Sequence, residues 1–141
     1  MGKLTIIRGL PGAGKSRLGH FLAEQCGCFL LEPDQFLTCD GRYCYTPAEY
    51  QAAERLALDF AAHLEGLGCD LVYADVLPRK VDVRRVIDAY GCDEEDAMVV
   101  SLAIGTAASK ANNRHHVNPL DIRAMARAWQ QWPGEHEERP E

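Results

Sequence analysis

Short apolar runs alternate along the chain with longer stretches in which apolar residues recur every three or four positions. Four of the runs are apolar and rich in β-branched or bulky residues, as buried strands are. They lie at 4–7, 29–31, 70–75 and 98–102. Because none of them alternates between apolar and polar positions, we expect a parallel sheet that is covered on both faces.

Helix signals fill the intervals between these runs, as expected for right-handed βαβ units. Thr46 begins a capping box, and Pro47 stands at the first helical position. The first expected helix runs from Lys15 to Gly27, and the second from Pro47 to Gly66 or Gly68. A third follows the apolar stripe Val83–Tyr90 and ends at Gly91. Two more are expected over 107–112 and over 119–131, the last of them capped by Asn118. The residues that the second helix is expected to bury are Ala53, Leu56, Ala57, Phe60 and Leu64.

The chain ends in a polar segment that does not resemble the rest. Residues 133–141 are charged and carry a proline at or near each end, which favours a flexible acidic tail. With 141 residues in all, there is room for one domain, which we place at 1–132. Trp129 and Trp132, at the end of that domain, are expected to pack against it.

Charge and composition disfavour several classes of protein. The net charge of −6 disfavours a protein that coats nucleic acid or membranes through bulk charge. No apolar run reaches the ~18–20 residues of a membrane span, and the first residues do not form a signal peptide, so a cytoplasmic protein is expected. The six cysteines are interpreted mainly as reduced packing thiols, although three disulfides or a metal site built on Cys26 and Cys28 are alternatives.

The segment 9–16 matches the phosphate-loop pattern G-x-x-x-x-G-K-[ST] in full, between a predicted strand and a predicted helix. Its glycines let backbone N–H groups point at phosphate oxygens, and the helix that follows adds its dipole. Lys15 is expected to reach the β- and γ-phosphates of ATP, and the Ser16 hydroxyl to bind Mg²⁺. The residues expected to bind the nucleotide here are Gly9, Leu10, Pro11, Gly12, Ala13, Gly14, Lys15, Ser16 and Arg17.

Carboxylates follow two of the predicted strands, at the edge where ligands bind in parallel sheets. Asp34 follows the second strand and is a candidate to accept the proton of an attacking hydroxyl, or else a turn residue; Glu32 is a weaker candidate for the same role. Asp75 ends the third strand. It is a candidate Mg²⁺ ligand, a substrate-binding residue, or a helix-start aspartate.

Several basic residues are candidates for the far side of the site. Arg79 and Lys80 closely follow Asp75, and Arg84 and Arg85 lie on the next helix. Arg42 is a candidate substrate contact. Arg114 is expected to close over the triphosphate and stabilise charge in the transition state.

Three segments give the chain a resemblance to the small P-loop kinases related to the kinase domain of phage polynucleotide 5′-kinase and to zeta-toxin-like phosphotransferases. They are the phosphate loop at 7–16, the segment 33–43 and the segment 112–119. The resemblance implies a three-layer α/β/α sandwich with a parallel sheet of about four strands in the order 2-3-1-4 and a helical lid. It assigns Asp34 as the hydroxyl-activating aspartate, Arg114 as the lid arginine and Asp75 as the aspartate after the third strand.

The same resemblance implies transfer of the γ-phosphoryl group of ATP to a hydroxyl, with Mg²⁺. A polynucleotide 5′-hydroxyl is the leading acceptor, and a small-molecule or nucleoside hydroxyl is the alternative. Asp75-Val76-Leu77 stands where the family has Asp-Thr-Asn, so the acceptor is the least defined part. A second class of function is an ATP-binding switch or ATPase that transfers to no acceptor and acts through a partner.

Overall fold

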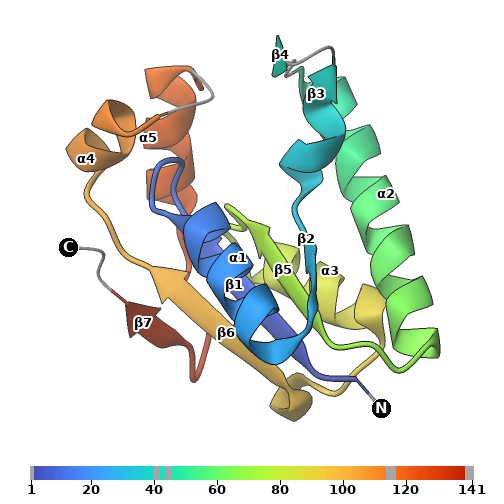
Figure 1. Cartoon of the computed structure of the whole chain (residues 1–141). Helices are drawn as coiled ribbons and strands as arrows, with labels where there is room; N and C mark the ends of the chain where they lie inside the picture. The colour runs from blue at the N-terminus through green and yellow to red at the C-terminus, as the bar shows by residue number, and fades with distance from the viewer. Residues whose placement is uncertain (1, 40–41, 44–45, 114–116, 139–141) are drawn as a thin grey trace.

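A computed structural model describes residues 2–39, 42–43, 46–113 and 117–138. A parallel five-stranded sheet in the order β2-β5-β1-β6-β7 forms its centre (Figure 1). The strands are β1 (Leu4–Gly9), β2 (Phe29–Leu31), β5 (Leu71–Asp75), β6 (Ala97–Leu102) and β7 (His136–Glu138), with a separate hairpin of β3 (Thr38–Cys39) and β4 (Arg42–Tyr43). The helices are α1 (Lys15–Cys26), η1 (Pro33–Leu37), α2 (Pro47–Gly66), α3 (Lys80–Tyr90), η2 (Glu94–Asp96), α4 (Thr106–Ala111) and α5 (Pro119–Ala128).

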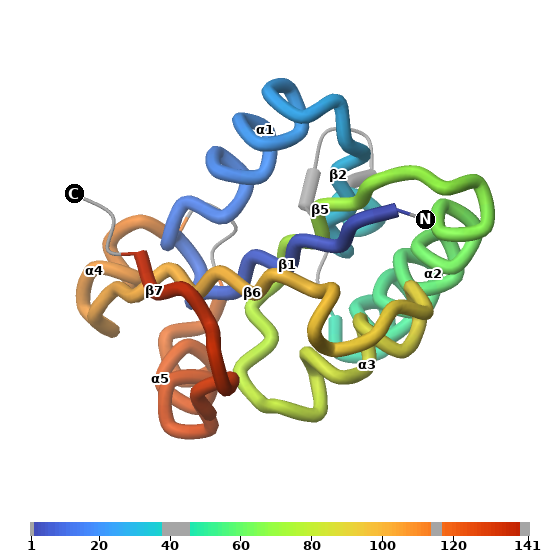
Figure 2. Tube along the Cα trace, turned by 90° about the horizontal axis from the view of Figure 1, so that it is seen from below, coloured from blue at the N-terminus to red at the C-terminus, as the bar shows by residue number. Residues whose placement is uncertain are grey.

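Helices cover both faces of the sheet, as Figure 2 shows with α1 on one side and α3 and α5 on the other. Two buried clusters correspond to these faces. Ile7, Val72 and Val100 belong to the cluster that packs with α1 residues, whereas Ile6 and Tyr73 belong to the larger cluster that also contains α2 and α3 residues. The expected α/β/α sandwich and the order of its first four strands are therefore confirmed.

Local signals place several helix ends accurately, although α5 ends at Ala128 rather than near residue 131. The Thr46 hydroxyl accepts a hydrogen bond from the Glu49 N–H, and the Asn118 side chain accepts one from the Leu120 N–H. Gly27 and Gly91 end α1 and α3 in the left-handed conformation that glycine adopts at low cost.

The face of α2 that is buried differs from the predicted one. Ala53, Ala57 and Leu64 are buried as expected, but Leu56 and Phe60 are 55% and 46% exposed. Ala61 is fully buried instead. Small side chains at 53, 57 and 61 let α2 approach its neighbours closely, so the larger apolar residues beside them remain at the surface.

The segment after residue 132 was expected to be a flexible tail, and for residues 136–138 this is wrong. His136, Glu137 and Glu138 pair with Val100, Ser101 and Leu102 as a fifth parallel strand, β7, at the edge of the sheet. Backbone hydrogen bonds hold this strand, so its polar side chains gave no apolar pattern to detect. Residues 139–141 lie outside the described part of the chain.

Trp132 is buried, and the indole of Trp129 lies against the guanidinium of Arg8, so both tryptophans pack as predicted. The described helices include none that is long and apolar enough to cross a membrane.

Candidate active site

The phosphate loop joins β1 to α1 at the carboxyl end of the sheet. Gly12 and Gly14 have φ of +79° and +93°, and Gly14 is the N-cap of α1. These left-handed positions, which favour glycine, curl the backbone ahead of the helix N-terminus. The Lys15 Nζ donates to the Leu10 carbonyl at 3.1 Å, so the lysine folds back over its own loop. The loop thus has left-handed glycine positions directly ahead of a helix N-terminus, as backbone anion-binding turns do.

Helix α4 packs directly on this loop. The buried Ser109 hydroxyl donates to the Pro11 carbonyl at 2.6 Å. A Cβ atom at Gly12 would lie 2.8 Å from Asn112, just after α4, so Gly12 is required for this close approach. The segment that precedes the expected lid is thus anchored to the phosphate loop by one hydrogen bond and one tight backbone contact.

Glu32 lies next to the proposed metal-binding serine. The Ser16 hydroxyl donates to Glu32 Oε1 at 2.5 Å. From the sequence, Glu32 was expected only as an alternative proton acceptor, so this contact was not predicted. A hydroxyl and a carboxylate are the hard oxygen donors that Mg²⁺ prefers, so the residues present fit that ion. A glutamate just after β2, two positions before Asp34, was the available signal.

Lys15, Asp34 and Asp75 converge on the same edge of the sheet. Burial lowers the pKa of Lys15, and the charges of Asp75, Asp34 and Glu32 oppose that shift. Asp34 lies in the first turn of η1 and is partly exposed. The structure therefore brings together the phosphate-loop lysine and both predicted strand-end aspartates.

Asp75 is buried and faces α2. The Tyr50 hydroxyl donates to Asp75 Oδ2, and the Val76 N–H donates to Oδ1 at 2.8 Å. The pKa of Asp75 is raised to about 7, chiefly by burial; the hydrogen bond from Tyr50 opposes this rise and the charge of Asp34 adds to it. Tyr50, whose position four residues into α2 gave no specific signal, was missed by sequence analysis.

Each of the three arginines at 79, 84 and 85 pairs with an acidic side chain. Arg79 lies 3.5 Å from Asp82, Arg84 lies 2.6 Å from Glu94, and Arg85 lies 2.9 Å from Glu54. The Arg79 pair lies at the start of α3, the Arg84 pair joins α3 to the η2 turn that follows it, and the Arg85 pair joins α3 to α2. The three arginines of the basic cluster that the sequence indicated are therefore paired with carboxylates.

Three further arginines were predicted to belong to the site, at positions 17, 42 and 114. Arg17 is exposed in the first turn of α1. Arg42 lies in the β3–β4 hairpin, but its side chain is outside the described part of the structure. Arg114, the expected lid arginine, also lies outside the described residues.

Arg8 is a fully buried arginine that immediately precedes the phosphate loop. Its Nε and Nη2 donate to the Leu77 carbonyl at 3.0 and 2.7 Å, and its Nη1 donates to Glu135 at 3.0 Å. The guanidinium lies 4.1 Å from the centre of the Trp129 ring. An arginine inside a buried strand needs such partners, which was the sequence signal available for it. It ties β1 to the segment after β5 and to the C-terminal segment.

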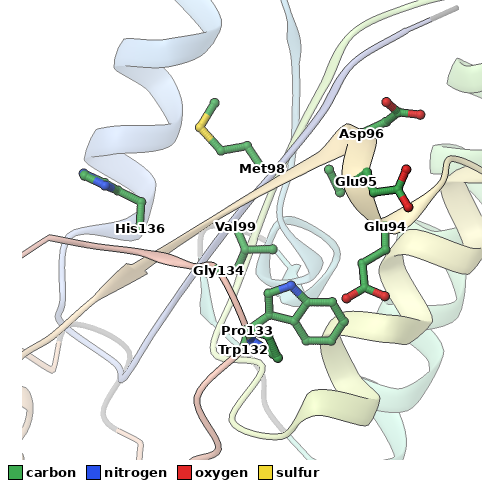
Figure 3. A pocket seen from close by; sticks show the side chains of 10 residues that line it. Glu94, Glu95, Asp96, Met98, Val99, Trp132, Pro133, Gly134 and His136 are labelled. Carbon is green, nitrogen blue, oxygen red and sulfur yellow. The ribbon is translucent and has the colours of Figure 1, made fainter.

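A pocket of about 690 Å³ lies elsewhere in the molecule (Figure 3). Trp132 and Val99 line it, with Glu94 and Glu95 on η2. In the sheet register, β6 begins opposite the start of β1, whereas the phosphate loop follows the end of β1. The pocket therefore belongs to the opposite end of the sheet from the phosphate loop.

Comparison with solved structures identifies the fold. A sugar kinase from Janibacter sp. superposes with a TM-score of 0.71 at 12% identity, covering 99% of this chain and 85% of that one. The APS kinase of Mycobacterium tuberculosis in complex with AMPPNP and APS gives 0.63 at 17% identity, over 99% and 89%. The Pnkp1/Rnl/Hen1 RNA repair complex gives 0.72 at 14% identity, over 90% of this chain but 43% of that one.

No protein-family model matches the sequence, and no curated protein sequence matches it either. The similarity therefore lies in the backbone rather than in the sequence. The structural neighbours named above include a sugar kinase and an APS kinase, and their parallel sheet and covering helices correspond to those described here. This chain has the fold of the P-loop kinases.

Proposed function

We propose that the protein is an ATP-dependent kinase that transfers the γ-phosphoryl group to the hydroxyl of a small molecule. The observation that carries the proposal is the meeting of a complete phosphate loop with Asp34 and Asp75 at one edge of the sheet. A phosphate loop alone would fit any NTPase, but the carboxylates beside it suit activation of a hydroxyl.

Each residue has a definite part in the proposed reaction. Asp34 takes the proton of the acceptor hydroxyl as the oxygen of that hydroxyl bonds to the γ-phosphorus. The bond between the γ-phosphorus and the β,γ-bridging oxygen breaks, and ADP leaves. Lys15 and the loop N–H groups bind the phosphates, and Arg114 contributes positive charge in the transition state. The Ser16 hydroxyl and the Glu32 carboxylate would hold Mg²⁺, which when bound neutralises phosphate charge.

A small acceptor is favoured over a polynucleotide by the state of the basic residues. Arg79, Arg84 and Arg85 are paired with carboxylates, so they offer little positive charge to a phosphate backbone. A polynucleotide 5′-hydroxyl is the second candidate, supported by the similarity to the Pnkp1-containing complex.

The proposal is tested by transfer from γ-labelled ATP to a panel of sugars, amino sugars, polyols, nucleosides and 5′-hydroxyl oligonucleotides. Labelled small-molecule product is the expected result. Labelled oligonucleotide, with binding that weakens steeply as salt rises, would favour the second candidate. ATP hydrolysis with no labelled product from any acceptor would support the ATP-binding switch instead.

A further inference from the structure

Asp75 is a buried carboxylate whose two hydrogen-bond donors are both neutral. Tyr50 and the Val76 N–H occupy its oxygens, and its side chain forms no ion pair with any cationic side chain in the described ranges. Removing a carboxylate from water without a cation is unfavourable. The Asp75 carboxyl group is therefore either protonated or suited to bind a positively charged group of a ligand.

The charges around Asp75 are predominantly negative. Asp34 raises the pKa of Asp75, and Glu54 follows Tyr50 by one helical turn on α2. The described cations near this group are Lys15, which the donor phosphates would engage, and Arg85, which is bound to Glu54. An acceptor with a phosphate or carboxylate would meet repulsion here, whereas an ammonium would be attracted.

Tyr73 supplies a second observation that points to a ligand. Its side chain is fully buried, and its hydroxyl has no hydrogen-bond partner among the residues that the structure describes. Because Tyr73 and Asp75 lie two positions apart on β5, they face the same side of the sheet. Burial raises the pKa of Tyr73, as do the charges of Asp75 and Glu54, so this oxygen lies within electrostatic range of both carboxylates.

Tyr50 has an alternative hydrogen-bond acceptor. Its hydroxyl lies 3.5 Å from Glu54 Oε2 while it donates to Asp75. A ligand N–H group can therefore replace the Tyr50 hydroxyl on Asp75, and the phenol turns to Glu54 without losing a partner.

We propose that the phosphoryl acceptor is a small hydroxyl compound that carries an amino group, and that its ammonium binds Asp75 beside the hydroxyl of Tyr73. The inference rests on the proposed function, because it takes Lys15 to be occupied by the donor phosphates. Tyr50 is then a specificity-determining residue, since its hydroxyl holds the place that the ammonium takes.

The test uses matched compounds that differ in one substituent. Glucosamine, glucose and glucuronate form one set; ethanolamine, ethylene glycol and glycolate form another. Binding of each to the full chain, saturated with AMPPNP and Mg²⁺, is measured by calorimetry at neutral pH. We expect the amino member of at least one set to bind at least tenfold more tightly than the neutral member, and the acidic member to bind least. Transfer from γ-labelled ATP is measured in parallel.

Two variants separate the roles. Asp75→Asn should abolish the preference for the amino compound, while Glu95→Gln, an exposed carboxylate of η2, should retain it. Equal binding of amino and neutral compounds, tighter binding of acids, or no binding of any amino compound would overturn the inference. Selective binding of the amino compound without transfer would uphold the recognition and contradict the proposed kinase reaction, so the two failures are distinguishable.

Discussion

The guanidinium of Arg8 donates to the carboxylate of Glu135 across 127 positions of sequence, at 3.0 Å, with both side chains almost completely buried. The pair joins the residue that precedes the phosphate loop to the segment that leads into β7. Burial lowers the pKa of Arg8, and Glu135 opposes this shift. The C-terminal segment is thereby an integral part of the domain rather than an appendage.

Removing one partner of this pair should be costly. Glu135→Ala leaves the Arg8 charge buried and only partly satisfied, which typically costs about 3–5 kcal/mol of unfolding free energy. In a domain of this size that corresponds to a fall in Tm of roughly 10–17 °C. Thermal unfolding followed by circular dichroism checks this. The matched control is Glu94→Ala, which breaks the exposed pair with Arg84 and should leave Tm almost unchanged. Equal effects of the two variants would contradict the structural role of Arg8.

Substitution of Gly12 should weaken ATP binding, because this glycine lies in close contact with Asn112. Gly12→Ala combines a φ of +79° with a contact at 2.8 Å to Asn112, so α4 must move away from the phosphate loop. We expect ATP to bind at least about tenfold more weakly, a loss of about 1.4 kcal/mol. Gly134→Ala is the control, because Gly134 has a φ of +78° but nothing within 4 Å of the added Cβ. Calorimetric titration with ATP compares the two, and unchanged affinity in Gly12→Ala would show that the α4 contact does not shape the site.

Asp75 should make stability depend on pH. Its pKa is raised from 3.8 to about 7 in the folded chain, so between these values the folded state binds a proton that the unfolded state has released. Stability from this group is therefore present at low pH and lost as pH rises toward 7, by about 1.4 kcal/mol per pH unit. Urea unfolding between pH 5 and pH 8 measures it. Asp75→Asn should flatten the dependence, and an unchanged slope in that variant would contradict the assignment.

The parts of the fold that follow from local chemistry were predictable from the sequence. Thr46 and Gly91 mark helix ends through hydrogen bonding and backbone conformation within a few residues, and the structure places both helix ends there. Strand β7 and the partners of Arg8 were not predictable, because they depend on contacts between segments that are far apart in sequence. The exposure of Phe60 has the same origin, since small alanines determine which face of α2 packs.

The candidate site also has a part that was predictable from the sequence and a part that was not. The phosphate loop is a contiguous motif, so its place between β1 and α1 was predictable. Glu32 and Tyr50 gain their importance only from their contacts with Ser16 and Asp75, which the fold creates. The pairing of Arg85 with Glu54 likewise joins α3 to α2 and changes the expected charge of the acceptor side.

In the reaction proposed above, this chain transfers phosphate to a hydroxyl with Asp34 as the proton acceptor. The most direct test compares wild type with Asp34→Asn, using Asp59→Asn, an exposed carboxylate of α2, as the control. Initial rates of labelled product are measured with the best acceptor of the panel, alongside ATP affinity. We expect Asp34→Asn to cut transfer by about 10²–10⁴-fold with ATP affinity preserved, and Asp59→Asn to behave as wild type. Transfer by Asp34→Asn at the wild-type rate would contradict the role of Asp34, and ATP turnover with no acceptor labelled by either protein would contradict the proposed reaction.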